Sequence, residues 1–333
     1  MLDEDSERLA EMRSAPAADG VVVVGQWSTR VAARQLPNLV LRGFVVIAPL
    51  LLLFCGLEVS QRAGRAAAEA LNPLSFGSAV LRHTVMSAVA FGFMVLPLAT
   101  IEQLFPTARP SLRSYAVGIA GWVLAWVLGY AVGIASQEAI GLLGLTPALV
   151  VKVSSFGMAI SIPLILLNMF VFDFFYYWFH RMQHRFTALW RLHAVHHSIR
   201  NLNAIMSFHH PIEDLLRIVP ITLPLAALVR FDDAPVVPLL SALLAAMGQF
   251  IHTDTRLNFG PFRVILGDGH YHRIHHSERD EHRSRNFAAF FPVWDRIFRT
   301  LHMPKCGEYP PVGLKGRPNG MTMREYFLGI ASN

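Results

Sequence analysis

The stretch VFDFFYYWFHRMQH (residues 171–184) joins the end of a long apolar segment directly to a pair of histidines. His180 and His184 are four positions apart, so on an α-helix they lie on one face and can point at a common target. Asp173 falls close to the same face, two turns earlier. The run of aromatic residues 174–179 is typical of the level at which a helix leaves a membrane. The stretch therefore predicts a membrane helix with metal-binding groups at its end.

Composition also indicates a bilayer. The chain has 333 residues, of which 53% are hydrophobic and only 16% are charged, whereas roughly a quarter of the residues of a soluble domain are charged. Four apolar segments reach the roughly 20 residues that a helix needs to cross a bilayer; they are 39–59, 78–102, 114–135 and 149–179. Two shorter apolar runs, 215–229 and 234–251, flank a polar turn at 230–233. They predict a spanning or re-entrant hairpin, kinked at its prolines.

These segments predict an all-α fold. It is an integral membrane helical bundle of about four transmembrane helices and a short helical hairpin, with a cytosolic, histidine-rich helical cap. The expected parts, in chain order, are a cytosolic N-terminal arm (1–38), transmembrane helices (39–169), a histidine-box catalytic domain that includes the membrane hairpin 215–251 (170–302), and a C-terminal tail (303–333). The acidic, polar start MLDEDSERLAEM is unlike a secretory signal peptide.

The basic residues orient the predicted helices. The formal charge of +6 comes almost entirely from arginine. In a membrane protein such an excess marks the cytosolic face, so we do not interpret it as nucleic-acid binding. Arginines gather in the N-terminal arm, in the loop after the second apolar segment, after the fourth segment and in the C-terminal region. A multi-pass chain with four crossings and a cytosolic N-terminus brings all of these regions to the cytosol. The two cysteines, Cys55 and Cys306, form neither a disulfide framework nor a CxxC metal motif.

All 15 histidines except His83 lie at or after position 180, and most of them form three boxes. The boxes are HRMQH (His180, His184), HAVHH (His193, His196, His197) and HRIHH (His272, His275, His276). A single HxxxH is weak evidence, but two boxes of identical HxxHH spacing are specific. Each HxxHH box can aim up to three imidazoles at one point. Eight histidines exceed what one tetrahedral zinc uses, so the boxes predict two metal ions in a nitrogen-rich site.

Three stretches resemble the fatty acid hydroxylase/sterol desaturase superfamily. They are DxxYYxxHRxxH (173–184), LWRLHAVHHS (189–198), and HRIHHS (272–277) followed by Asn286, WDRIF (294–298) and Thr300. They match the histidine boxes and the closing signature of that superfamily in order, over about 170–302. The resemblance implies two Fe ions in a di-iron site and O2 as co-substrate. It also implies a separate cytochrome b5- or ferredoxin-type electron donor.

The resemblance implies two further ligands, His210 in HPIE (210–213) and His252 in FIHTD (250–254). Three residues, Asp173, Asn286 and Asp295, are expected to position the ligand histidines without binding the metal themselves. Asp173 could accept the N–H of a ligand imidazole and fix its tautomer, or it could cap a helix or pair with an arginine. No side chain is expected to be catalytic beyond the metal ligands.

The chain departs from the superfamily pattern at three places. Asn286-Phe287-Ala288 stands where relatives commonly have Asn-Tyr-Gly, and Phe298-Arg299-Thr300 stands where they have Phe-Gly-Thr. Asp268-Gly269 precedes the third box where a proline is common. None of these changes removes a ligand.

The predicted function is that of a membrane-bound oxidoreductase that hydroxylates or desaturates a C–H bond of a lipid such as a sterol or fatty acyl chain. One alternative is a zinc-dependent membrane hydrolase, which needs a glutamate base as in HExxH; none of the boxes contains a glutamate. Another is a non-enzymatic metal transporter, whose ligands usually lie at the bilayer midplane. The boxes lie outside the apolar spans, and dependence on O2 and reductant separates the oxygenase from both.

Overall fold

The computed structural model describes residues 76–107, 112–152, 158–231, 236–317 and 323–328. All of them belong to the unit Arg42–Asn333. This part of the chain is mostly helical, as predicted. The N-terminal arm 1–38 and the first apolar segment, 39–59, lie outside the described residues.

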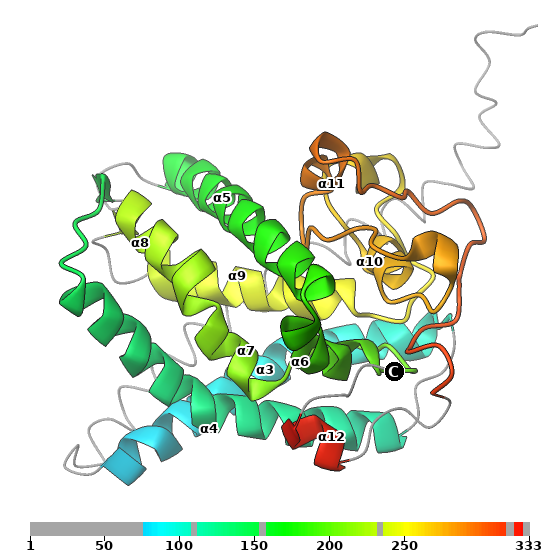
Figure 1. Ribbon diagram of the computed structural model, residues 1–333, viewed down its shortest axis with the longest axis horizontal. Coiled ribbons are helices and arrows are strands. Elements are labelled where there is room, and N and C mark those ends of the chain that lie inside the picture. Colours follow the sequence, from blue (N-terminus) through cyan, green and yellow to red (C-terminus); the bar gives the residue numbers. More distant parts are fainter. Residues whose placement is uncertain (1–75, 108–111, 153–157, 232–235, 318–322, 329–333) are drawn as a thin grey trace, which may run out of the picture. The chain divides into compact units, whose positions relative to one another are not determined.

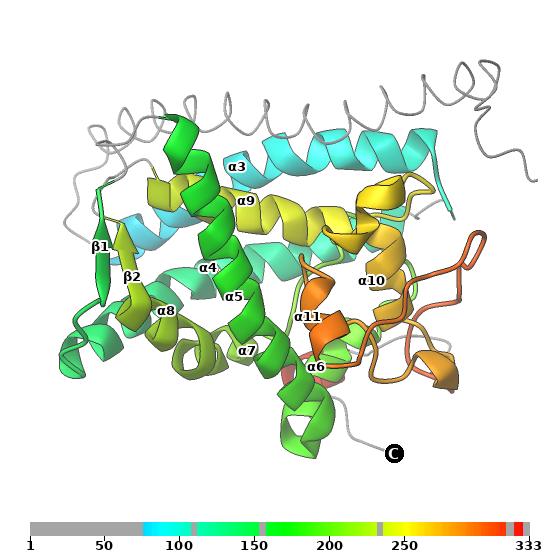
Figure 2. The same cartoon turned by 90° about the horizontal axis from the view of Figure 1, so that it is seen from above.

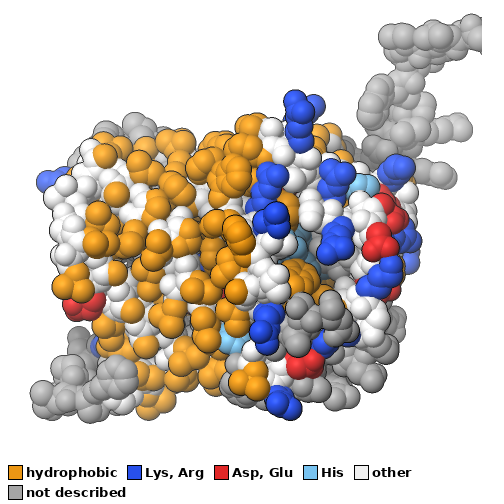
Figure 3. All heavy atoms as spheres, viewed as in Figure 1, with side chains coloured by type: hydrophobic (Ala, Val, Ile, Leu, Met, Phe, Trp, Pro, Cys, Tyr) orange, Lys and Arg blue, Asp and Glu red, His pale blue; other side chains and the backbone are white. Residues whose placement is uncertain are grey.

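Three helices are long and apolar enough to cross a membrane. They are α3 (Phe76–Leu104), α4 (Leu112–Leu142) and α5 (Met158–Arg185), with candidate spans at Val80–Leu104, Ser114–Leu142 and Ile162–Arg185. They confirm a helix in each of the second, third and fourth apolar segments. Large apolar side chains on them stay exposed, such as Leu96 on α3 and Leu167 on α5. Figure 3 shows apolar side chains spread over one side of the view and charged ones gathered at the other, a division that a membrane protein needs.

The fourth apolar segment is not one helix from residue 149, which corrects the sequence-based prediction. Its first residues form β1 (Leu149–Val151), which pairs in parallel with β2 (Val229–Phe231). The expected polar turn at 230–233 therefore begins as a strand. Successive β-branched valines favour extended backbone at β1, and the pairing satisfies backbone groups that an apolar environment would leave without partners. Both views place β1 and β2 at the end away from α10 (Gly269–His275) (Figure 1, Figure 2).

The predicted hairpin is a broken helix followed by a second helix. The first part runs through α7 (Pro211–Leu216), the π-turn η2 (Ile218–Thr222) and α8 (Leu223–Leu228), and the second is α9 (Val236–Ile251). The expected kink occurs at Pro220, inside η2. Proline has no N–H and clashes with the carbonyl four residues back, so the chain widens to a π-turn in which Thr222 N–H donates to Arg217 O. With 16 residues, α9 is shorter than the roughly 20 that a full crossing needs.

Shorter helices complete the described fold. Helix α6 (Thr187–His197) packs on α5, and α10 packs on α9. The structure also contains the 3-10 turns η3 (Gly260–Val264) and η4 (Asp280–His282), with α11 (Val293–Ile297) and α12 (Met323–Leu328). The rings of Phe170 and Phe174 on α5 pack against the ring of Trp294 on α11, with the ring centroids 4.5 and 5.0 Å apart, respectively. Aromatic packing therefore joins the C-terminal segment to the membrane helix that carries the first box.

A buried glutamate ties the membrane helices to the histidine-bearing loops. Glu102, near the end of α3, is fully buried. Its Oε1 accepts the backbone N–H groups of Ala204 at 2.7 Å and Asp254 at 3.0 Å, and its Oε2 accepts the Tyr115 hydroxyl from α4 at 3.0 Å. Since Asp254 follows His252 by two residues, this carboxyl group anchors a histidine loop to two predicted membrane helices.

Two glycines let the loop after the second box lie against the backbone of α4. A Cβ at Gly118 would be 2.4 Å from Ile205 Cγ2, and a Cβ at Gly121 would be 2.8 Å from Phe208 Cγ. Trp122 Nε1 donates to Ile205 O at 2.9 Å across the same contact. Glycine is needed at both positions because a Cβ atom would prevent the loop from lying this close to α4.

We predict that Gly121→Ala destabilises the protein by about 1–3 kcal/mol, because the added methyl group displaces the Phe208 ring. The matched control is Gly133→Ala on the same helix, where a Cβ meets no atom of the described residues within 4 Å. That change should be neutral or slightly stabilising, since alanine favours helix. Thermal unfolding of the detergent-solubilised variants measures both. Equal melting temperatures for the two variants would contradict the close packing.

Candidate metal centre

Nine histidines from four elements converge in two groups. Site A contains His180, His184, His193, His197 and His275; site B contains His196, His252, His272 and His276. Within each site the ring nitrogens that face inward all lie within 4.8 Å of one another. The first box lies at the end of α5, the second on α6 and the third on α10, while His252 follows α9. These nine are the eight box histidines and His252, all of them singled out from the sequence.

Each HxxHH box is shared between the two sites, which corrects the expectation that a box aims all three rings at one point. The second box gives His193 and His197 to site A and His196 to site B. The third box gives His275 to site A, and His272 and His276 to site B. On a helix the i and i+4 side chains are about 40° apart, whereas i+3 lies about 60° to the other side of i. The spacing therefore suits two neighbouring targets better than one.

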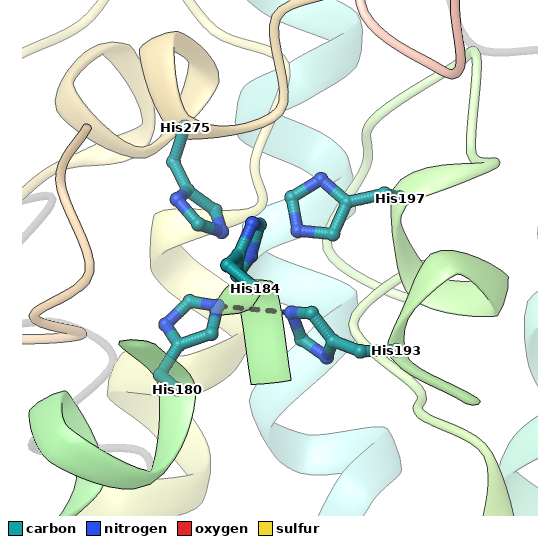
Figure 4. Close-up of side chains that lie close together, drawn as sticks. All are labelled: His180, His184, His193, His197 and His275. Atoms are coloured by element: carbon teal, nitrogen blue, oxygen red, sulfur yellow. Dashed lines mark hydrogen bonds between the residues drawn. The ribbon is translucent and has the colours of Figure 1, made fainter. Parts of the chain in front are cut away.

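The distances between ring nitrogens fit ligands of a shared ion. Figure 4 shows the five rings of site A around a common centre. The Nε2 atoms of His180 and His193 are 2.9 Å apart. In site B, Nε2 of His252 is 3.1 Å from that of His196 and 3.0 Å from that of His272. Two nitrogens bound at about 2.1 Å and at right angles to each other would be about 3.0 Å apart.

Hydrogen bonds behind the rings fix which nitrogen faces inward. Nδ1 of His196 lies 3.0 Å from Phe208 O, and Nδ1 of His252 lies 2.6 Å from Gly248 O. A carbonyl oxygen only accepts, so each Nδ1 carries the proton and each Nε2 of a neutral ring carries a lone pair. Nδ1 of His180 is held in the same way by Phe287 O at 2.7 Å, and Nδ1 of His275 by Arg285 O at 2.8 Å.

The facing lone pairs need a cation between them. Burial lowers the pKa of His252 to about 4 and the pKa of His196 well below its usual value, so both rings are neutral near pH 7. Their Nε2 atoms then face each other without a proton to share. In site A, the buried Nε2 atoms of His184, His197 and His275 have no hydrogen-bond partner within the described part of the chain. Metal coordination satisfies all of these nitrogens, so the residues present fit metal ions at both sites.

The donor set narrows the choice of metal. Neither site, as the described residues form them, includes a carboxylate or a thiolate. Imidazole suits iron, zinc and copper. Five nitrogens at site A exceed the four ligands of tetrahedral zinc, which favours an ion of higher coordination number such as iron.

His210 lies outside both groups, although the resemblance implied it as a ligand. It is the N-cap of α7, where its Nδ1 accepts the N–H of Ile212 at 3.2 Å. The preceding residue, His209, lies closer to site B, since its ring stacks on that of His196 with the centroids 4.0 Å apart. His209 also groups with His193 and Glu213. Two adjacent histidines at a turn cannot be told apart by spacing alone, because the path of the backbone decides which one points inward.

Glu213 has the role that was expected of Asp173. Its Oε2 lies 3.1 Å from His193 Nδ1 and also accepts a hydrogen bond from Gln183 Nε2. Burial raises the pKa of Glu213 to about 7, although the nearby Arg217 opposes the rise. Coordination through His193 Nε2 would place the proton on Nδ1, and an Nδ1–H that donates to Glu213 favours its carboxylate form. Glu213 is the last residue of the HPIE stretch quoted for His210, and the spacing of that stretch does not reveal its contact with His193.

Asp173 holds backbone instead of an imidazole. Its carboxylate accepts the N–H groups of Ala289, Phe290 and Phe291, the shortest at 2.8 Å. Successive N–H groups of a tight loop form a concave donor site, and a carboxylate on the facing helix fills it. Asp173 thereby fixes the loop that begins at Phe287, whose carbonyl orients His180.

Asp295 and Asn286 hold the same loop from the other side. Asp295 accepts the N–H groups of Phe287 and Ala288, each at 2.8 Å, and the hydroxyl groups of Tyr271 and Thr300. Asn286 has a left-handed backbone (φ 56°). Its side-chain amide donates to Tyr271 O and His302 O and accepts the N–H of His302. Asp173, Asp295 and Asn286 thus support the ligand histidines indirectly, by holding the backbone of the loops around them.

The departures from the superfamily pattern have structural consequences. Arg299 occupies a left-handed conformation (φ 61°) where the resemblance expects glycine, a conformation that costs a non-glycine residue about 1–2 kcal/mol. Asp268 stands where proline is common and caps α10, since its side chain accepts the N–H of Tyr271 at 2.9 Å. The helix that carries the third box, α10, therefore still begins at a defined capping residue.

We predict that Asp173→Asn lowers both stability and metal content. The amide can no longer accept all three N–H groups as a charged acceptor, so the expected loss is about 3 kcal/mol. The matched control is Asp214→Asn, whose carboxylate is partly exposed and pairs with Arg217. Thermal unfolding and metal analysis of the purified variants measure the effect. A metal content unchanged from wild type in Asp173→Asn would show that the loop does not depend on this residue.

Comparisons with known proteins match the part of the chain that contains the histidine boxes. Residues 165–300 match the family model described as fatty acid hydroxylase. Alkylglycerol monooxygenase of Homo sapiens is 33% identical over 130 residues, which is 39% of this chain and 28% of that protein. The ornithine lipid hydroxylase OlsE of Rhizobium tropici is 29% identical over 154 residues, 46% of each chain. No solved structure matches. The chain thus spans between about a quarter and a half of the length of these relatives, and the region matched by the fatty acid hydroxylase family model, residues 165–300, contains all three histidine boxes.

Proposed function

We propose that this chain is a membrane-bound di-iron oxygenase, which uses O2 and electrons from a separate donor to hydroxylate a C–H bond of a lipid. One observation carries the proposal: nine imidazoles, eight of them buried and that of His184 half-buried, divide into two adjacent sites whose lone pairs face inward. Two redox-active ions side by side suit the reduction of O2, which needs several electrons. The names of the relatives, a monooxygenase and a hydroxylase of lipids, support oxygen insertion over desaturation.

The protein's own part in the reaction is to hold, orient and shield the metals. The site A and site B histidines would hold one ion each, and the bound di-iron centre would supply O2 activation and attack on an unactivated C–H bond. The carbonyl groups of Phe287 and Arg285 orient His180 and His275. The rings of Trp190 and Phe287 cover His184, with centroids 4.9 and 5.1 Å away. Such rings would keep water away from the metal, where it would otherwise cause side reactions.

We propose that the protein crosses the membrane several times and that both metal sites lie on its cytosolic face. The end of α3, the start of α4 and the end of α5 meet on the side of the histidines, where Pro106 bridges to Thr255 and Asn203 donates to Ser114. Basic side chains gather at the same end of the surface in Figure 3. In the sequence, Arg181 and Arg191 lie within or beside the first two boxes, and Arg283 follows the third. Arginine-rich segments mark the cytosolic face. A lipid would reach the site laterally, along the exposed apolar helices.

A zinc hydrolase fits the same residues less well. The acid that lies against a site A histidine is Glu213, and it contacts Nδ1 of His193, on the side of the ring away from the metal. A general base must be within hydrogen-bonding reach of the metal-bound water. Among the described residues, neither site offers such a carboxylate.

We predict about two iron ions per chain in the purified, iron-loaded protein. His184→Ala removes a ligand of site A only, and His272→Ala removes one of site B only, so each should lose about one ion. His83→Ala, on α3, is the control and should keep both. Elemental analysis of protein purified in mild detergent measures the ratio. One ion in the wild type, or the loss of both ions from a single substitution, would contradict two separate sites.

The substrate and the reaction can be identified in one experiment. Lipid mass spectrometry compares aerated cells that express the wild type, His275→Ala or His83→Ala together with an electron donor. We expect a lipid that gains one oxygen in the wild type and His83→Ala cells only. An unchanged lipid profile with folded, iron-loaded wild type would contradict the oxygenase, and a lipid that loses two hydrogens would replace hydroxylation by desaturation.

A further inference from the structure

The segment after the third box lies across that box. Residues 301–317, which we name the C-terminal strap, make hydrogen bonds to α10 and its end. Arg273 Nε donates to Pro310 O at 2.9 Å, and His270 Nε2 lies 2.6 Å from Glu308 O. Gly313 N–H donates to His276 O at 3.1 Å. The position of the strap therefore bears directly on the site B histidine His276 and on α10, the helix that carries His272.

A separate group of potential ligands joins the strap to the 3-10 turn η4. His282 ends η4, while His302 and Glu308 belong to the strap. One ligand atom from each lies within 4.8 Å of the others. His282 Nε2 is 3.2 Å from Glu308 Oε1, and His302 Nε2 is 3.4 Å from Glu308 Oε2. The two imidazole rings meet with their centroids 4.6 Å apart.

These distances suit shared coordination better than direct ion pairing. A charge-assisted N–H···O bond to a carboxylate is typically about 2.7–2.9 Å, and both contacts here are longer. Ligands bound at about 2.0–2.1 Å to a tetrahedral ion are about 3.3–3.4 Å apart. The nitrogen–oxygen separations lie near that value.

The three side chains are also held in place from behind. Nδ1 of His282 lies 2.9 Å from Ser277 Oγ, which leaves Nε2 to face the group. Oε2 of Glu308 accepts the N–H of Lys305 at 2.8 Å. The His282 side chain is fully buried, whereas those of His302 and Glu308 are 26% and 15% exposed. Such a site is preorganised, and it is open to solvent on one side for a water ligand.

We propose that His282, His302 and Glu308 form a third metal site, which binds a zinc-type divalent cation and clamps the C-terminal strap onto the third box. Two imidazoles and one carboxylate, with a water as the fourth ligand, are a favourable set for tetrahedral zinc. The role is structural: the cation joins η4 to both ends of the turn 302–308. The site shares no residue with sites A and B and does not depend on the oxygenase proposal.

The test compares the zinc content of full-length wild type with those of Glu308→Gln and His302→Ala, each purified in detergent. Glu281→Gln is the matched control, because Glu281 lies in the same turn as His282 with a 63% exposed side chain that pairs with Arg279. We expect both variants to lose about one zinc per chain relative to wild type and Glu281→Gln, with unchanged iron. Zinc added after mild chelation should raise the melting temperature of wild type and control but not of the two variants.

Comparison between variants separates this site from zinc that replaces iron at sites A and B, since such zinc would be the same in all four proteins. Equal zinc content in all four would overturn the proposal and leave a hydrogen-bonded group without a metal. Loss of zinc from Glu281→Gln as well would also overturn it, because the cation would then be held by surface charge. If Glu308→Gln does not fold, His302→Ala decides, since its partly exposed ring can be removed without opening a buried cavity.

Discussion

Hydrogen bonds between imidazole Nδ1 atoms and backbone carbonyl groups are the interaction on which the rest of this structure depends. A buried polar group without a partner costs several kcal/mol, and this chain buries eight of the nine site histidines in one region. The carbonyl groups of Phe208, Gly248, Arg285 and Phe287 each fix one ring and its tautomer. The inward nitrogens are then left as converging lone pairs that a metal cation can satisfy, so the fold provides preformed ligand sets.

Carbonyl acceptors hold rings in place only if their own loops are rigid. Asp173 and Asp295 hold the loop that begins at Phe287 from two sides, and close packing against Gly121 holds Phe208. Glu102 ties the segment after His252 to two apolar helices. The charged and glycine residues within or beside the membrane helices thus serve the metal sites, although they contact no ring nitrogen. A polar group in an apolar helix is costly, and this structural task explains why Glu102 and Asp173 lie there.

The repeated HxxHH spacing gains a specific meaning from the two sites. In each box the i and i+4 histidines serve one site and the i+3 histidine serves the other, with the assignment reversed between α6 and α10. The two helices therefore contribute to both sites in complementary ways. Each of these boxes would hold the two ions of the proposed centre at a set separation, which is what a reaction shared between two metals needs. The first box and His252 then complete sites A and B, respectively.

The sequence by itself determined three apolar helices and the eight box histidines, because both depend on local periodicity, whereas His252 was implied by the family resemblance. A run of apolar residues reaches the length of a bilayer regardless of its neighbours, and HxxHH places its rings on one helix face. Only the tertiary structure decided the division into two sites, the place of His209 beside site B, and the contact of Glu213 instead of Asp173 with a site A imidazole. The same holds for β1 and β2, which pair across about 80 residues of chain. These features join segments far apart in sequence, and the relative path of two backbones, which no local spacing encodes, determines which side chain meets which partner.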